Sequence, residues 1–139
     1  MSLTLALAMV VAIVDGDSIK VTDKEQNQYD VRLAYIDAPE LSQPYGEMSK
    51  EILGSMITNE RVTLRCPTQD ASGEWVCIVW KEGYDTSRRM INKGGAWVDS
   101  TSDAGAAWYR DEQKARKAKK GLWSLPEEQR VLWSWKPTK

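Results

Sequence analysis

The chain has 139 residues, a formal net charge of −1 and no histidine. This length is typical of one domain with a full hydrophobic core, and the near-neutral charge excludes a polycation that holds nucleic acid by bulk attraction. Without histidine, acid–base chemistry near neutral pH must rest on carboxylates, lysine, tyrosine or a water bound to a metal.

The stretch from residue 3 to residue 14 is apolar except for Thr4. It is too short to cross a membrane as a helix, and it lacks the basic region that opens an intact signal peptide. Residues 5–8 are compatible with the trimmed stub of such a peptide, whereas the rest of the stretch is typical of a first strand. We expect no membrane partner.

The hydrophobic pattern predicts five short strands, at residues 8–13, 18–22, 29–36, 62–66 and 75–80. Apolar residues at helical spacing predict a helix at 46–57, between the third and fourth strands. Asp85 is typical of an N-cap for a short helix that ends at Asn92. A longer helix is predicted over 104–120, with Gly121 as its stop.

This order does not fit repeated strand–helix–strand units. It favours an α+β fold that is mainly β, a five-stranded barrel of the oligonucleotide-binding type with about three helices packed on it. We expect one domain over 1–139, with a core at about 8–123 and a tail at 124–139. We expect three tryptophans toward this end of the chain to pack on the barrel rather than stack on bases: Trp123, Trp133 and Trp135.

The two cysteines, Cys66 and Cys77, fall in two strand-like runs joined by a loop. Antiparallel neighbours would bring them close enough for a disulfide. A pair of free buried thiols is at least equally compatible with the pattern, so the sequence leaves the pairing open.

Three acids stand where apolar, strand-like runs give way to turns: Asp17, Asp37 and Glu40. Arg32 lies within the strand-like run that precedes Asp37. Taken singly, the acids are typical of plain tight turns and the arginine of a surface ion pair. Taken together, they suit a metal–phosphate site. Carboxylate oxygens bind hard cations, and a guanidinium grips phosphate oxygens.

The chain resembles the staphylococcal nuclease family over roughly residues 11–123. The similarity is carried by six short runs in order: 15–19 (Asp-Gly-Asp-Ser-Ile), 31–40, 43–46 (Gln-Pro-Tyr-Gly), 92–97, 112–117 and 120–123. The resemblance implies a Ca²⁺-dependent hydrolase of phosphodiester bonds in DNA and RNA. It implies that Asp17, Asp37 and the backbone carbonyl of Ala38 bind Ca²⁺. Glu40 would position or deprotonate the attacking water, and Arg32 would bind the phosphate.

One departure from the family pattern is at a position with a catalytic role in the family. Family members usually carry an Asp-x-Tyr-Gly-Arg run whose arginine is a second catalytic guanidinium. Here Ser72 stands at the tyrosine position and Glu74 at the arginine position. Loss of one preorganised donor costs on the order of 10² to 10³ in rate. Three nearby arginines are candidates for a substitute: Arg65, Arg88 and Arg89.

Two hypotheses follow. The first is a weak Ca²⁺-dependent nuclease acting on single-stranded or frayed DNA, RNA or both as a monomer. The second is a catalytically impaired barrel that binds nucleic acid or a protein partner. The basic residues of the last helix are expected to form a solvated face. The sequence leaves the compartment open, although the family and the apolar start favour export over the cytoplasm.

Overall fold

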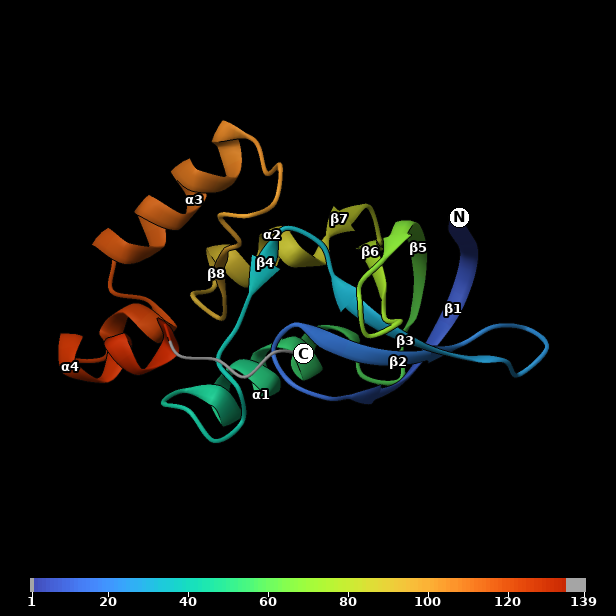
Figure 1. The fold of residues 1–139 in the computed structure, drawn as a ribbon, viewed down its shortest axis with the longest axis horizontal. Helices are drawn as coiled ribbons and strands as arrows, with labels where there is room; N and C mark the ends of the chain where they lie inside the picture. Colours follow the sequence, from blue (N-terminus) through green and yellow to red (C-terminus); the bar gives the residue numbers. More distant parts are fainter. Residues whose placement is uncertain (1, 135–139) are drawn as a thin grey trace.

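A computed structural model describes residues 2–134 of the chain. Five strands form a closed, mixed barrel (Figure 1): β1 (Leu3–Ile13), β2 (Ser18–Thr22), β3 (Gln28–Leu33), β5 (Arg61–Gln69) and β6 (Trp75–Lys81). The strands are hydrogen-bonded in the order β3-β2-β1-β5-β6, and a parallel pairing of β3 with β6 closes the barrel. The short strand β7 (Tyr84–Asp85) pairs with β6. The predicted α+β barrel of the oligonucleotide-binding type is confirmed.

Four α-helices accompany the barrel, where the sequence predicted about three: α1 (Gly46–Ile57), α2 (Thr86–Asn92), α3 (Ala106–Lys117) and α4 (Glu127–Arg130). Two 3₁₀ helices, η1 (Gly121–Ser124) and η2 (Val131–Ser134), flank α4. Figure 1 shows α3 and α4 beside the barrel. The short ribbon of β4 (Ile36–Asp37) and β8 (Trp97–Val98) lies between these helices and the barrel. No helix within residues 2–134 has both the length and the apolar character needed to cross a membrane.

Two hydrophobic clusters hold these parts together. Alternate side chains of the barrel strands fill the first, as the two-residue period of a strand requires: Val10, Ile19, Val21, Val31, Leu33, Leu64 and Val79 among others. The second joins α3, η1 and η2 through Ala115, Leu122, Trp123 and Trp133. Trp123 and Trp133 are therefore buried in packing, as expected, although against this second cluster. Trp135 lies outside the described residues.

The strand boundaries differ from the predicted ones by more than one residue in three places. β1 begins at Leu3, and its first residues pair with β5. β3 ends at Leu33, because Tyr35 adopts a positive φ of 73° that breaks the strand before β4. β5 continues through Pro67, which was expected in a loop. The register shifts between Arg65 and Thr68, and such a bulge accommodates a proline that cannot donate to the ladder.

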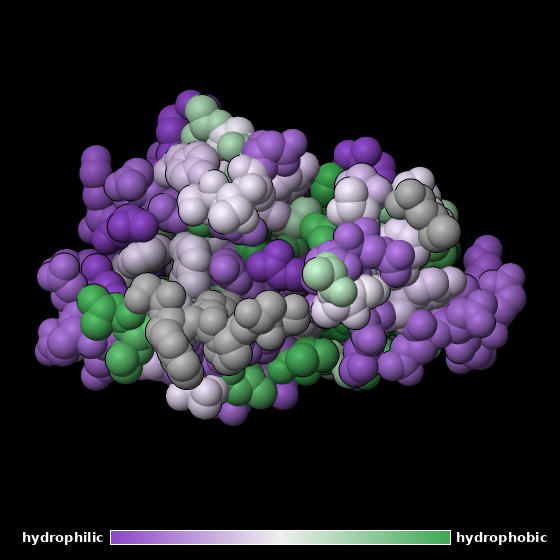
Figure 2. All heavy atoms as spheres, viewed as in Figure 1, coloured by the Kyte–Doolittle hydropathy of each residue, from purple (hydrophilic) through white to green (hydrophobic). Residues whose placement is uncertain are grey.

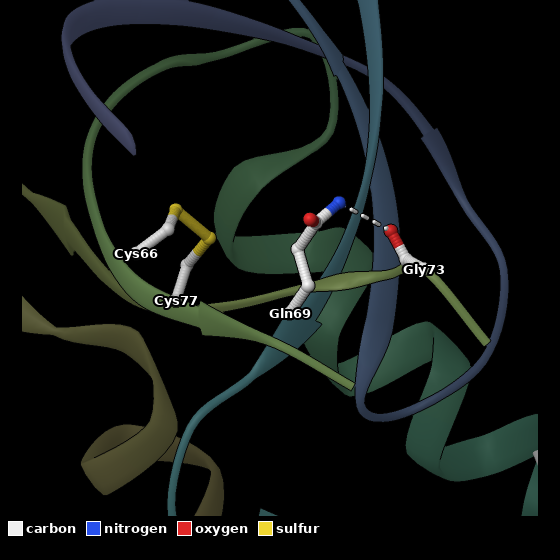
Figure 3. Close-up of a disulfide and its surroundings, with 4 residues drawn as sticks. All are labelled: Cys66, Gln69, Gly73 and Cys77. Carbon is white, nitrogen blue, oxygen red and sulfur yellow. Dashed lines mark hydrogen bonds between the residues drawn. A yellow bond between two sulfur atoms is a disulfide. The ribbon is translucent and has the colours of Figure 1, made fainter. Parts of the chain in front are cut away.

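Cys66 and Cys77 form a disulfide between β5 and β6 (Figure 3). The register places Arg65 opposite Ile78, so the two cysteines are direct neighbours across the ladder. Both are fully buried within the barrel core. Beyond them, Gln69 donates a side-chain hydrogen bond to the Gly73 carbonyl at 3.1 Å. The disulfide thus fixes the base of the hairpin whose tip carries residues 70–74.

Candidate metal and phosphate site

Asp17 lies in the turn that joins β1 to β2 and is fully buried. Its Oδ1 accepts from the Ser18 hydroxyl at 3.2 Å, and its Oδ2 accepts from the backbone N–H of Ala38 at 2.9 Å. The turn is itself fixed, because the Asp17 N–H donates to Asp15 Oδ1 at 3.0 Å. These bonds aim the Asp17 carboxylate at the segment that carries Asp37 and Ala38, 20 and 21 residues further along.

Gly16 makes this approach possible. A Cβ at Gly16 would lie 2.8 Å from the Cβ atoms of both Ala38 and Ser49. Real Cβ atoms do not come this close, so a side chain at position 16 would push the turn away from β4 and α1. The Asp15-Gly16-Asp17 run, which alone predicts only a turn, is here the contact between two halves of the candidate site.

Arg32 leaves β3 and reaches the next strand of the chain. Its Nη2 donates to Asp37 Oδ1 at 3.2 Å and to the Ile36 carbonyl at 3.5 Å. Burial alone would lower the pKa of Arg32, but the charges of Asp17, Asp37 and Asp99 outweigh it and the pKa is raised. The guanidinium is therefore held permanently charged among acids, as a phosphate-binding group must be.

Asp99 is a site residue that the sequence did not reveal. Its Oδ2 lies 3.9 Å from Arg32 Nη1, whereas Asp37 is bonded to the other terminal nitrogen, Nη2. Thr101 donates to Asp99 Oδ1 from both its N–H and its hydroxyl, so the carboxylate is held in place. The Val98-Asp99-Ser100-Thr101 run signals only a turn after β8, and the contact with Arg32 spans 67 positions of sequence.

Glu40 opens the loop between β4 and α1. Its N–H donates to Gln43 Oε1 at 2.8 Å, and its carbonyl accepts from the Gln43 N–H at 2.9 Å. The loop closes tightly on Gly46, because a Cβ at Gly46 would overlap the Glu40 carbonyl oxygen. Glu40 is partly buried and lies in a loop rather than in a strand.

Glu74 follows the tight turn between β5 and β6. Its N–H donates to Asp70 Oδ1 at 3.0 Å, and the same oxygen accepts from the Ser72 N–H and hydroxyl. Arg32 pairs with Val76 in the parallel ladder. Glu74 lies immediately before β6, two residues ahead of the residue that pairs with Arg32.

The arginines proposed as substitutes have other partners. Arg88 Nε donates to Asp111 Oδ2 at 2.6 Å, and the Arg89 guanidinium lies 4.3 Å from the centre of the Tyr84 ring. Both line a pocket of about 450 Å³ beside α2. Arg65 is exposed on β5, opposite Ile78. Arg88 and Arg89 thus interact with other groups. Glu74 places a negative charge at the position where the family usually has the second guanidinium.

Within residues 2–134, no group of three or more His, Cys, Asp or Glu lies close enough together to hold a metal ion. A cation would thus be held by fewer protein carboxylates, with Asp17 and Asp37 as the predicted pair. The chemistry of the donors fits a hard cation, because carboxylate and backbone carbonyl oxygens are what Ca²⁺ binds. The hydrogen bonds from Ala38 and Ser18 orient Asp17, which is the usual task of groups behind a ligand.

The barrel, with acids at its strand ends and an arginine among them, defines a domain of the oligonucleotide-binding type. The family model described as staphylococcal nuclease homologue matches residues 30–125. The chain belongs to this family, as its sequence motifs predicted.

Three relatives illustrate the similarity. An uncharacterized endonuclease of Escherichia coli O157:H7 is 33% identical over 116 residues, which cover 83% of this chain and 75% of the relative. An uncharacterized endonuclease of Haemophilus influenzae is 30% identical over 83% of this chain and 65% of the relative. A probable staphylococcal-like nuclease of Oryza sativa subsp. japonica is 31% identical over 81% of this chain and 34% of the relative.

Proposed function

We propose that this protein is a Ca²⁺-dependent nuclease that hydrolyses phosphodiester bonds in DNA and RNA, at a rate reduced by Glu74. Family membership and relatives named as nucleases support nuclease activity. The observation that carries the proposal is the hydrogen bond from Ala38 to Asp17, which joins the turn before β2 to the segment beside Arg32.

Ca²⁺ would be held by the carboxylates of Asp17 and Asp37 and the carbonyl of Ala38. When bound, it would supply positive charge against the phosphate and lower the pKa of a nearby water. Water would complete its coordination, because Ca²⁺ takes six to eight oxygen ligands in general.

The protein's own groups would divide the remaining work. Glu40 would accept a proton from the attacking water as its oxygen bonds to phosphorus. Arg32 would donate to the phosphate oxygens and stabilise the charge that develops on them. The bond to the leaving oxygen then breaks, and that oxygen takes up a proton. We expect a single-stranded or frayed substrate and a monomeric enzyme.

The test is cleavage of single-stranded DNA and RNA by purified protein with millimolar Ca²⁺, with chelator as the blank. Glu40→Gln should abolish cleavage and leave the fold intact. The exposed helix residue Glu51, changed to Gln, is a matched control that should cleave like the wild type. Activity that survives Glu40→Gln, or that persists in chelator, would contradict the proposal.

A catalytically impaired binding module is the second candidate, and a specific observation favours it. Arg32 faces Asp37 and Asp99, and Glu74 is a further acid two residues before Val76, the strand partner of Arg32. Such a site resists a phosphate unless a cation is present. This candidate predicts salt-sensitive binding of nucleic acid, or binding of a protein, without cleavage at any Ca²⁺ concentration.

A further inference from the structure

The carboxyl-terminal segment touches the loop that begins with Glu40, although 89 residues separate each contacting pair. Gln43 Nε2 donates to the Leu132 carbonyl at 3.0 Å. The indole N–H of Trp133 donates to the Pro44 carbonyl at 2.7 Å. Two hydrogen bonds therefore join neighbouring residues of η2 to neighbouring residues of one short loop.

The Gln43 side chain connects Leu132 directly to the backbone of Glu40. Its amide oxygen accepts from the Glu40 N–H, while its amide nitrogen donates to Leu132. Only one orientation of the amide satisfies both partners, because an amide oxygen cannot donate and an amide nitrogen cannot accept. The position of the Glu40 backbone and the position of η2 are thus coupled through a single side chain.

Trp133 links the same loop to the other half of the site. It is 6% exposed, and its ring stacks on that of Trp97 with centroids 5.3 Å apart. Trp97 is the strand partner of Asp37 in the β4–β8 ribbon. One buried ring therefore contacts both the Pro44 side and the Asp37 side of the candidate site.

The segment is itself anchored to the body of the protein. Arg130 donates to the Leu125 carbonyl at 2.9 Å and to the Trp123 carbonyl, which ties α4 to η1. Trp123 meets Trp133 edge-on, with centroids 6.0 Å apart. A firmly held segment can restrain a loop, whereas a frayed tail cannot.

We propose that Leu132 and Trp133 form a clasp that fixes the Glu40 loop against the β4–β8 ribbon, with Gln43 and Trp133 as positioning residues for Glu40. The inference rests on the proposed function for its catalytic consequence. The restraint itself is a property of the fold and is measurable without any substrate.

Two variants remove one contact each and keep the packing. Gln43→Glu retains an acceptor for the Glu40 N–H but turns a carboxylate oxygen toward the Leu132 carbonyl. Trp133→Phe retains an aromatic ring but has no donor for Pro44. Leu132→Ala is the matched control, because Leu132 contributes its carbonyl and its side chain is 53% exposed.

The first readout is amide hydrogen exchange by NMR at Glu40, Gln43 and Gly46, whose N–H groups are all bonded within the loop. We expect roughly tenfold faster exchange in Gln43→Glu and Trp133→Phe, the effect of losing a single hydrogen bond. Leu132→Ala should exchange like the wild type, and the amides of β1 and β2 should be unchanged in every variant. Unchanged exchange in the loop would overturn the clasp.

The second readout is Ca²⁺-dependent cleavage. A loosened general base should lower kcat by roughly ten- to a hundredfold with little change in KM, as small misplacements of catalytic groups do. A variant with faster loop exchange but wild-type kcat would overturn the positioning role. If the wild type itself does not cleave, the proposed function fails, and exchange alone decides whether the clasp exists.

Discussion

Replacement of Glu74 by arginine should raise the cleavage rate, because it restores a guanidinium where the family usually has one. Val76 pairs with Arg32, and Glu74 precedes Val76 by two residues. An offset of two residues along a strand and one strand spacing across it place the two Cα atoms about 8 Å apart. An extended arginine side chain at position 74 therefore reaches a phosphate bound to Arg32.

The size of the effect follows from that distance. Two unit charges about 8 Å apart interact by about 0.5 kcal/mol in water and about 2 kcal/mol at an effective dielectric constant of 20. Reversal of the sign at position 74 changes this interaction by about twice as much, about 1–4 kcal/mol. At about 1.4 kcal/mol per tenfold in rate, the expected gain runs from roughly fivefold to about 10³-fold.

The assay compares initial rates on single-stranded DNA at saturating Ca²⁺ for the wild type, Glu74→Ala and Glu74→Arg. Glu82→Arg is the matched control: it makes the same charge change at the far end of β6, about 26 Å along the strand. Rates should rise from wild type through Glu74→Ala to Glu74→Arg, and Glu82→Arg should match the wild type. A Glu74→Arg rate no higher than that of Glu82→Arg would refute the assignment of this position.

Three further predictions concern charge and stability. Asp99→Asn should tighten inorganic phosphate binding by up to about fivefold in titration calorimetry, because a partly exposed ion pair with Arg32 is worth about 0.2–1 kcal/mol; equal or weaker binding would contradict this. The Cys66→Ala/Cys77→Ala variant should lose about 3 kcal/mol of unfolding free energy in urea, the entropy of a loop of 11 residues. Reductant should lower the unfolding free energy of the wild type to that of the variant and leave that of the variant unchanged. If reductant present during unfolding does not change the unfolding free energy of the wild type, the disulfide is absent. Burial raises the pKa of Asp85 despite its hydrogen bonds from the N–H groups of residues 88 and 87. The folded state therefore holds its proton more tightly, and this contribution to stability is lost as pH rises above 3.8 through the folded pKa. Asp85→Asn keeps the cap. In urea denaturation its free energy of unfolding should rise relative to that of the wild type as the pH rises through this window; a constant difference across pH would contradict this.

Local signals were enough for most of the elements. The helix predicted at 46–57 matches α1, because its apolar residues fall at helical spacing within one segment. Asp85 caps α2 as predicted, with its side chain accepting from the Arg88 N–H. Both features depend on residues within one or two turns of chain. The barrel class followed from the order of such elements and was confirmed by the structure.

Contacts between distant segments were not predictable in this way. Asp99 follows a short strand and has the sequence context of an ordinary turn acid. The β4–β8 pairing and the hydrogen bond from the Asp99 N–H to the Tyr35 carbonyl bring it to Arg32. Gln43 lies within a recognised motif, but its second partner is a backbone carbonyl, which leaves no trace in residue identity. Pro67 argues against a strand in any local analysis, and the bulge that accommodates it is a property of the β5–β6 pairing.

The balance of charge around Arg32 links the two candidate functions. Asp17, Asp37 and Asp99 all raise its pKa, so one positive charge faces three negative ones before Glu40 and Glu74 are counted. A phosphodiester adds a further negative charge, and in this site it meets net repulsion unless a divalent cation arrives with it. Because binding linkage is reciprocal, each ligand should then strengthen the binding of the other. If the protein acts as proposed, Glu74 at the position of the second guanidinium shifts more of the required positive charge from the protein to the cation. The proposed activity should then depend steeply on the Ca²⁺ concentration.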